Sequence, residues 1–328
     1  MLLWTRDPAQ AERIDAAREN ARYLAGVRIP EAVTVTADLA RAAGAPALII
    51  ATPAHGVAAL RDRLAAALRP EHLLLSATKG LAPGDGRRMS ELWSEALPPE
   101  RIAVLSGPNI SHEVAAGLPA PTVIASTDTG TAKRFQSLVG TPMLRVYTNE
   151  DVIGVELCGA LKNIIAIGAG AIDGIGYGGN AKAGFMTRGL AEIARFAFAH
   201  GANPLTPAGL AGIGDLIATC TSPHSRNRTV GELLAAGLDP EAVRSRLGGQ
   251  VAEGIGTTAA VVAAARAGGI PMPIAEETHR VLFEGLPVRD AMRALMQREP
   301  GDELAGPLAD LSRLLADLRS ASGRTDAG

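Results

Sequence analysis

The chain has 328 residues, of which 47% are hydrophobic and 20% are charged, and its formal net charge is -2. This composition is typical of a globular protein with two sizeable cores, and the near-neutral charge gives no reason to expect a nucleic-acid partner. The sequence holds two cysteines, Cys158 and Cys220. They do not resemble a disulfide framework, so we expect a reducing, cytoplasmic setting. No uninterrupted apolar run reaches the roughly 18 residues of a membrane span, and the first residues do not resemble a signal peptide.

Short apolar runs alternate with amphipathic stretches over the first half of the chain. Strands are predicted at Leu2–Thr5, Val33–Thr36, Ala47–Ala51, Leu73–Ala77, Ile102–Leu105, Thr122–Ala125 and Leu144–Tyr147. Helices are predicted at Ala9–Leu24, His55–Leu68, Met89–Leu97, Asn109–Ala116 and Gly130–Val139. This alternation, with nearly continuous apolar strands, indicates an α/β fold with a parallel, doubly wound sheet of the Rossmann type.

The pattern changes after Asn149. From Asp151 to Arg319 the sequence has helical periodicity, interrupted by glycine and proline, and no convincing strand. We therefore predict a dinucleotide-binding domain over residues 1–149 and a helical substrate or catalytic domain over 150–319. Residues 320–328 are small and polar, and we expect them to form a disordered tail.

The usual opening of a dinucleotide-binding fold, a strand followed by a G-x-G-x-x-G turn and a helix, does not open this sequence. The first strand, Leu2–Thr5, instead resembles the second strand of such a unit. Arg6 follows it, where a side chain meets the adenosine ribose, and there it could read a 2′-phosphate and favour NADP. A surface arginine after a strand is an equally good interpretation.

In the run Gly159–Asn180, Lys162 and Asn163 lie side by side within an apolar, glycine-rich helix. Burial lowers the pKa of a lysine toward the range that is useful for proton transfer. Spacing alone supports an alternative equally well, in which the ammonium group of Lys162 reaches the surface from a core helix.

Three further segments carry polar side chains suited to a phosphorylated ligand. Ser225, Arg226 and Asn227 offer a hydroxyl, a guanidinium and an amide in sequence, although a solvated loop that caps the next helix fits equally well. Lys79 and the Gly107–Asn109 segment each follow a predicted strand, at the edge where open α/β sheets bind ligands.

The run Gly159–Asn180 resembles the signature of the bacterial-type NAD(P)-dependent glycerol-3-phosphate dehydrogenases. Four other segments resemble the same family in the same order: Thr78–Leu81, Ser106–Pro108, Ser225–Asn227 and Gln250–Gly254. The resemblance implies an oxidoreductase that interconverts dihydroxyacetone phosphate and sn-glycerol 3-phosphate with NADP or NAD. It also implies a role in glycerophospholipid synthesis and a homodimer.

The resemblance assigns roles to individual residues. Lys162 would be the general acid/base and Asp215 its partner, although without the resemblance Asp215 is better interpreted as a helix cap. Asn109 stands where the family has threonine or serine, and its amide group can still donate a hydrogen bond. The substrate would be bound by Lys79, Gly107, Asn109, Lys162, Asp215, Ser225, Arg226 and Asn227. The cofactor would be bound by Arg6, Lys79, Ser111, Arg226, Val251 and Glu253, and no metal is implied.

Two alternatives remain open at this point. Without a glycine turn there is no helix N-terminus to receive the pyrophosphate, and the sheet should have an internal gap or an exposed edge. One hypothesis is that the true start lies upstream of Met1. The other is that the chain is a truncated, catalytically impaired protein that binds a phosphometabolite or mediates oligomerisation.

Overall fold

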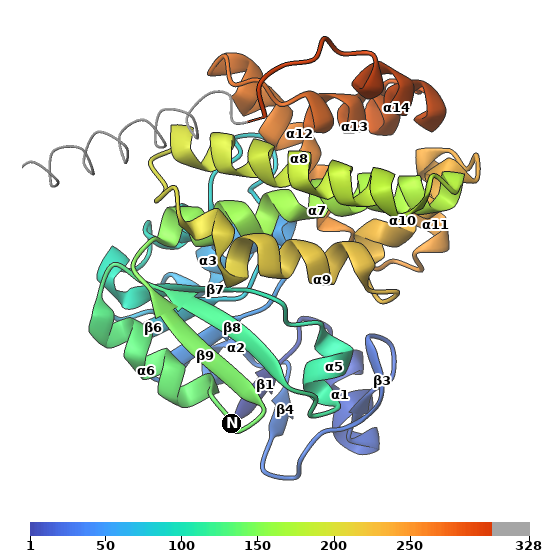
Figure 1. The fold of residues 1–328 in the computed structure, drawn as a ribbon. Helices are drawn as coiled ribbons and strands as arrows, with labels where there is room; N and C mark the ends of the chain where they lie inside the picture. Colours follow the sequence, from blue (N-terminus) through green and yellow to red (C-terminus); the bar gives the residue numbers. More distant parts are fainter. Residues whose placement is uncertain (304–328) are drawn as a thin grey trace, which may run out of the picture.

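The computed structural model describes residues 1–303, in which an α/β part precedes a helical part (Figure 1). The predicted tail, residues 320–328, lies outside the described residues, as do residues 304–319 of the predicted helical domain. The α/β part contains β1 (Leu2–Trp4), α1 (Pro8–Ala17), β2 (Glu19–Asn20), β3 (Leu24–Arg28), β4 (Thr34–Thr36), α2 (Leu39–Ala43), β5 (Ala47–Ile50), α3 (Val57–Leu64), β6 (Leu73–Ser76), α4 (Met89–Trp93), β7 (Ile102–Ser106), α5 (Ser111–Ala115), β8 (Ala120–Ala125), α6 (Thr129–Val139) and β9 (Leu144–Asn149), with short 3-10 turns at Ala54–Gly56 and Pro99–Arg101.

Two residues separate β9 from the helical part. It contains α7 (Val152–Ile175), α8 (Gly178–Ala199), a 3-10 turn (Thr206–Ala208), a π-helical turn (Leu210–Gly214), α9 (Asp215–Thr221), α10 (Arg226–Ala235), α11 (Pro240–Arg246), α12 (Glu253–Ala267), α13 (Pro273–Phe283) and α14 (Val288–Met296). The predicted combination of a Rossmann-like sheet and a helical C-terminal part is confirmed.

The main sheet has the strand order β5-β6-β7-β8-β9. Strands β5, β6 and β7 are parallel to one another, but β8 is antiparallel to β7. The prediction of an all-parallel sheet was therefore wrong at this position. The reason is the connection between β7 and β8, which holds only the five-residue helix α5 with no buried residue. A parallel neighbour would need a crossover helix packed on the sheet.

Alternate side chains of the strands face two different cores. Leu74 packs with α3 and α4, together with Trp93 of α4. Leu75, the next residue of β6, packs on the opposite face with Phe135 of α6. Because successive strand side chains point to opposite faces, an apolar run such as Leu73–Ser76 requires helices on both sides.

Strands β1 and β4 pair in parallel with each other and form a two-stranded sheet of their own. Among the described strands, β1 pairs only with β4, and β5 pairs only with β6. The predicted interruption of the Rossmann sheet is therefore present between these two sheets. Trp4 of β1 still packs against the α3–α4 core, so the smaller sheet adjoins the larger one.

The helix predicted at Ala9–Leu24 was wrong in its second half. Helix α1 ends at Ala17, and Arg18 adopts a left-handed conformation with φ of 52°. The Arg18 guanidinium donates to the carbonyl oxygens of Pro30 and Val33 at 2.6 and 2.7 Å, which turns the chain away from the helix. The following residues form the β2–β3 hairpin, which the helical periodicity did not predict.

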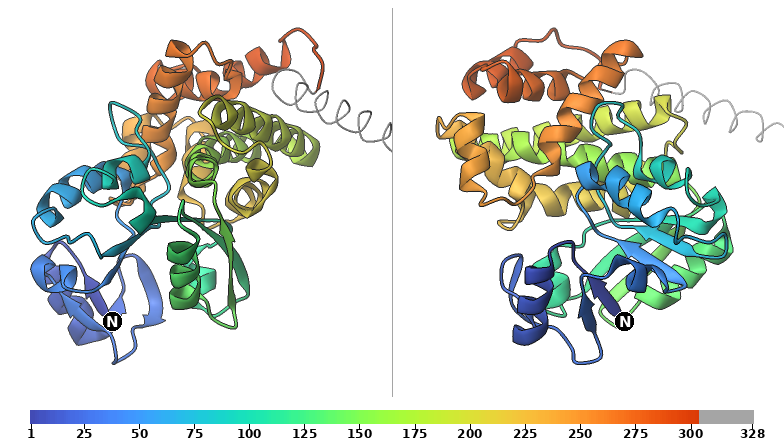
Figure 2. Two further views of the ribbon diagram at one scale, coloured as in Figure 1. Left: turned by 90° about the vertical axis from the view of Figure 1, so that its left-hand side faces the viewer. Right: turned by 180° about the vertical axis from the view of Figure 1, so that it is seen from behind.

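Helix α7 lies at the centre of the helical part, surrounded by α8, α10, α12 and α13, and these helices gather beside the sheet (Figures 1 and 2). Close packing depends on glycine: a Cβ atom on Gly170 would overlap the carbonyl oxygen of Arg228, and one on Gly231 would overlap that of Ile167. Helix α7 is long and apolar enough to cross a membrane, but 78% of its most apolar window is buried, so it is a core helix.

Candidate functional site

The site lies where the helical part meets the ends of β6 and β7. Lys162 is in the middle of α7 and is 5% exposed, and Asp215 is the first residue of α9 and is 2% exposed. The Lys162 Nζ donates a short hydrogen bond to Asp215 Oδ1 and a second one to Thr219 Oγ1 at 2.7 Å. The lysine is therefore buried and paired, and the alternative of a lysine reaching the surface was wrong.

Asp215 is the centre of this cluster. Its Oδ2 accepts from Lys79 Nζ at 2.8 Å, from Ser106 Oγ at 3.3 Å and from the Gly107 N–H at 3.4 Å. Two ammonium groups, one from each part of the chain, thus share one carboxylate, so the structure joins α9 to the carboxyl ends of β6 and β7.

Lys79 fixes the position of the loop after β7. Its Nζ also donates to the Gly107 carbonyl oxygen at 2.8 Å and to Asn109 Oδ1 at 2.5 Å. Gly107 has a φ of 127°, and a Cβ there would press on Thr122 of β8. A glycine is therefore needed for the loop to turn toward Lys79.

Opposing effects determine the charge states in the cluster. Burial lowers the pKa of Lys162 to about 8, because desolvation outweighs the attraction of the Asp215 carboxylate. Burial alone would raise the pKa of Asp215, but the Lys162 and Lys79 ammonium groups outweigh it and hold that pKa below its ordinary value. The arrangement can thus carry a lysine that gains and loses a proton near neutral pH, beside a carboxylate that stays ionised.

A chain of amides connects this cluster to α10 and α12. Asn163 Nδ2 donates to the Lys79 carbonyl oxygen at 3.2 Å, and Asn227 Nδ2 donates to Asn163 Oδ1 at 2.9 Å. Asn227 Oδ1 in turn accepts from the Gly254 N–H at 2.9 Å. Ser225 is the N-cap of α10 and accepts from the Arg228 N–H at 3.3 Å. These contacts hold the Ser-Arg-Asn segment beside the lysine cluster.

Glu253, at the start of α12, reaches across to the end of β5. Its Oε1 accepts from the Ala54 N–H at 3.0 Å. Burial raises the pKa of Glu253, against the effects of the Ala54 N–H, His55 and Arg226. Arg226 is exposed and is close enough to Glu253 to stabilise its charge. The predicted residues Arg226 and Glu253 therefore lie near each other, at the side of the site that faces β5.

Three predicted cofactor residues are not part of these contacts. Arg6 follows β1 in the separate two-stranded sheet and is exposed. Ser111 is the first residue of α5 and is also exposed, whereas Val251 is half-buried in the loop before α12.

The sequence analysis missed Thr219, Ser106 and Asn163 as members of the cluster. Thr219 follows Asp215 by four residues in one helix, a spacing that places two side chains on one face and could have revealed it. Asn163 follows Lys162 directly and Ser106 begins a segment that resembles the family, so both had a sequence signal, although their contacts with the cluster are tertiary. Within residues 1–303, no group of three or more His, Cys, Asp or Glu side chains could hold a metal ion.

Comparisons with known proteins identify the family of this chain. The profiles of the NAD-dependent glycerol-3-phosphate dehydrogenase N-terminus and C-terminus match residues 1–132 and 151–293. The chain is 46% identical over 304 residues to "Glycerol-3-phosphate dehydrogenase [NAD(P)+]" of Parafrankia sp. (strain EAN1pec), covering 92% of this chain and 91% of that protein. It is 47% identical over 311 residues to the protein of the same name from Thermobifida fusca (strain YX), covering 93% and 91%.

A solved structure is similar over nearly the same extent. The crystal structure of glycerol-3-phosphate dehydrogenase from Coxiella burnetii superposes with a TM-score of 0.86 at 36% sequence identity, covering 90% of this chain and 91% of that one. Both halves of the chain thus match one family, in one order and with one fold. The chain belongs to the NAD(P)-dependent glycerol-3-phosphate dehydrogenases.

Proposed function

We propose that this chain interconverts dihydroxyacetone phosphate and sn-glycerol 3-phosphate with NAD(P)H, with Lys162 as the general acid/base. The observation that carries the proposal is the buried Lys162–Asp215–Lys79 cluster, in which burial lowers the pKa of Lys162 to about 8. A group that titrates there can both give and take a proton at working pH. The product is a precursor for glycerophospholipid synthesis, the role that the family resemblance implies.

In the reduction, Lys162 Nζ gives a proton to the C2 oxygen of dihydroxyacetone phosphate as negative charge develops on that atom. When bound, NAD(P)H supplies the hydride to C2. Asp215 stays ionised and keeps the lysine protonated until the proton is needed, and Thr219 Oγ1 accepts a second hydrogen bond that orients Nζ. The neutral lysine that remains is favoured by its burial.

The phosphate group of the substrate needs donors that are fixed in place. We assign it to the Arg226 guanidinium, which is exposed at the start of α10, with Ser225 and Asn227 as supporting residues. Lys79, Gly107 and Asn109 would contact the three-carbon part, because their mutual hydrogen bonds place them around Asp215.

The cofactor would lie along the carboxyl ends of β5 and β6. Two hydroxyl groups there, Thr52 Oγ1 and Ser76 Oγ, are buried and have no hydrogen-bond partner among the described residues. A polar atom of a bound ligand could form the missing hydrogen bond with Thr52 Oγ1. Glu253 and Lys79 border this edge. Val251, Ser111 and Arg226 complete the set that we assign to the cofactor, and Arg6 would favour NADP over NAD.

These residues fit the nicotinamide end of the cofactor and leave its pyrophosphate without a glycine turn. We propose that one more parallel strand, followed by such a turn, fits between β1 and β5. Each of these strands pairs with a single described neighbour, which supports the proposal. Activity should then require that strand and turn.

Three further assignments belong to this proposal. We place the division between the two domains at residues 149 and 150, since β9 ends at Asn149 and α7 begins at Val152. We expect a cytoplasmic enzyme, because Cys158 and Cys220 are both free and buried. We expect a homodimer, and large apolar side chains exposed on the helical part, such as Leu205, favour it.

A substrate panel tests the proposed activity. In a version of the chain extended upstream, NADPH oxidation should be seen with dihydroxyacetone phosphate. In the reverse direction, NADP⁺ reduction should be seen with sn-glycerol 3-phosphate and not with 6-phosphogluconate or a 2-hydroxyacid. Binding of glycerol 3-phosphate by calorimetry, without turnover of any substrate, would instead support the non-catalytic alternative.

A further inference from the structure

Two histidines stack against each other between the two parts of the chain. His112 lies in α5, in the connection from β7 to β8, and His224 lies in the turn between α9 and α10. Their ring centroids are 4.9 Å apart and their planes differ by 16°. Figure 1 shows α5 below the helical part, under α9. The rings have the stacked arrangement that aromatic side chains favour, so they join α5 to the helical part.

Each histidine is close in sequence to a residue that we assign to the substrate. His112 follows Asn109 by three residues, and His224 precedes Arg226 by two. Three residues of chain span at most about 11 Å. Both histidine side chains are exposed. The stack therefore lies at the solvent edge of the site, next to the turn 222–225 that leads into α10.

The backbone on both sides of the stack is held by hydrogen bonds. The His112 carbonyl oxygen accepts from the Ala116 N–H at 3.0 Å within α5. The His224 N–H donates to Oγ of the buried Ser222 at 3.1 Å. Because the rings themselves are exposed, they can separate without uncovering a core. Such a contact can open and close at small cost.

The stack gives the Ser-Arg-Asn segment a direct contact with the α/β part. Asn227 reaches that part indirectly, through Asn163 of α7 and its hydrogen bond to the Lys79 carbonyl oxygen. The His224 ring, by contrast, lies against α5 itself. We therefore expect the stack to limit the movement of the turn 222–225 relative to the loop after β7.

We propose that the His112–His224 stack is a clasp that holds the turn before α10 against α5 and keeps Arg226 in position for the phosphate of the substrate. The inference rests on the proposed function, in which Arg226 and Ser225 bind that phosphate. A site that is ordered before binding loses less conformational entropy when the ligand binds, so the clasp should strengthen substrate binding. The two histidines are positioning residues, and proton transfer stays with Lys162.

Steady-state kinetics with dihydroxyacetone phosphate test the clasp in the version of the chain extended upstream. His224→Ala should raise the KM by about twofold to tenfold, the usual contribution of one aromatic pair, and leave kcat within about twofold. His112→Ala should have the same effect. The double variant should be no worse than either single one, because all three remove the same contact. An unchanged KM, or effects that multiply in the double variant, would overturn the clasp.

Replacing both histidines by phenylalanine separates stacking from other uses of the imidazole ring. A phenylalanine pair can stack but has no ring nitrogens. His112→Phe with His224→Phe should therefore return the KM to within about twofold of the unmodified value. A KM that stays as high as in the alanine variants would show that imidazole nitrogens contact the substrate, and would overturn the clasp.

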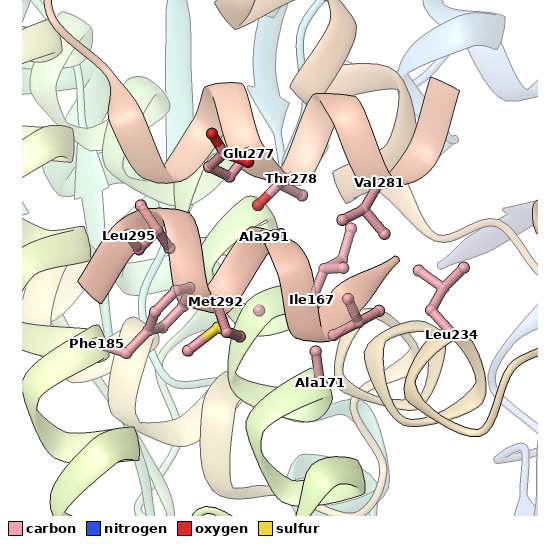
Figure 3. Close-up of a pocket in the computed structure, with 12 residues that line it drawn as sticks. Ile167, Ala171, Phe185, Leu234, Glu277, Thr278, Val281, Ala291, Met292 and Leu295 are labelled. Atoms are coloured by element: carbon pink, nitrogen blue, oxygen red, sulfur yellow. The ribbon is translucent and has the colours of Figure 1, made fainter. Parts of the chain in front are cut away.

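His279→Ala is the matched control. The His279 ring also contacts an aromatic ring, that of Phe283, at a centroid distance of 4.9 Å. His279 lies in α13 beside Thr278, which faces the apolar space between α7, α13 and α14 (Figure 3). Loss of this ring pair should leave KM and kcat unchanged.

Hydrogen–deuterium exchange tests the clasp without any need for turnover. In residues 1–328, His224→Ala should speed amide exchange in α5 by about twofold to tenfold, because a contact from the other part of the chain is lost. Exchange in α6, which packs on the sheet through Phe135, should not change. Equal α5 exchange in the variant and the unmodified chain would overturn the clasp. Absence of turnover in the unmodified extended version would instead count against the proposed function.

Discussion

At the scale of single residues, Lys162 is held between burial, which favours its neutral form, and Asp215, which favours its charged form. Arginine could not replace it, because a guanidinium does not lose its proton in proteins. Asp215 differs from Lys162 because it stays ionised: the Lys162 and Lys79 ammonium groups hold its pKa below the ordinary value. In the proposed mechanism, Lys162 would transfer the proton and Asp215 would stabilise the charge.

Replacing Lys162 by methionine should lower the rate of dihydroxyacetone phosphate reduction by about 10²- to 10⁴-fold, the usual contribution of one general acid. Steady-state kinetics on an active version of the enzyme measure this. Lys133→Met is the matched control, because Lys133 is exposed on α6 and should leave turnover near that of the unmodified enzyme. Full activity of Lys162→Met would remove the lysine from the mechanism.

The two directions of the reaction should respond oppositely to pH. Reduction needs the protonated lysine, so its rate should fall as pH rises through about 8, the pKa of Lys162. Oxidation of glycerol 3-phosphate needs the neutral lysine, so its rate should rise through the same pH. Rate profiles from pH 6 to 10 in both directions check this, and profiles that run in parallel would contradict it.

The family resemblance could indicate Lys162, Asp215 and Lys79 as candidate site residues, one from the long signature and two from shorter segments. Their mutual contact could not be predicted, because Lys79 and Asp215 are joined only when the helical part packs on the sheet. The same reason applies to Ser106, which reaches Asp215 from the end of β7.

At the scale of elements, the helices of the second part pack closely where glycines leave room for a neighbouring backbone. Gly170→Ala should destabilise the protein by about 3 kcal/mol or more, because the new methyl group would overlap the backbone of Arg228. Gly184→Ala in α8 is the control: nothing lies within 4 Å of its Cβ position. It should raise stability by about 0.5 to 1 kcal/mol. Urea denaturation distinguishes these effects.

A second element, α13, is capped by a buried carboxylate. Glu192 of α8 accepts from the Ile274 N–H at 2.7 Å and the Ala275 N–H at 3.2 Å, and burial raises its pKa to about 7. The pKa of Glu192 is higher in the folded state than in the unfolded chain. The stability that its protonated form contributes is therefore fully present below about pH 4.5 and is lost as pH rises through 7.

Glu192→Gln removes this titration. Relative to the unmodified chain, the variant should therefore gain stability between pH 5 and pH 8, by up to about 3 kcal/mol. Denaturation curves at the two pH values measure the difference. A difference in stability that does not change with pH would show that Glu192 does not titrate in this range.

Elements were predicted well where apolar runs are continuous, as in β5 to β9. They were predicted poorly where a single side chain redirects the backbone. Arg18 ends α1 through hydrogen bonds to Pro30 and Val33. The spacing of apolar residues along the chain cannot predict such contacts. The antiparallel β8 likewise depends on a connection that forms no crossover helix.

At the scale of the whole molecule, the sheet and the helical part are joined by polar contacts around the site. Besides Lys79 and Asp215, Glu156 of α7 accepts from the Ser90 N–H at 2.8 Å and from Arg88 at 3.0 Å. Glu253 contacts Ala54 on another side. The two parts therefore present one site between them.

The most direct measurement is NADPH oxidation with dihydroxyacetone phosphate, followed by absorbance, for residues 1–328 and for a version extended upstream. The proposal that a strand and glycine turn fit between β1 and β5 predicts turnover in the extended version and little in residues 1–328. Turnover that is equal in both would show that the turn is not needed. The absence of turnover in both would contradict the assignment of catalysis to the Lys162 cluster.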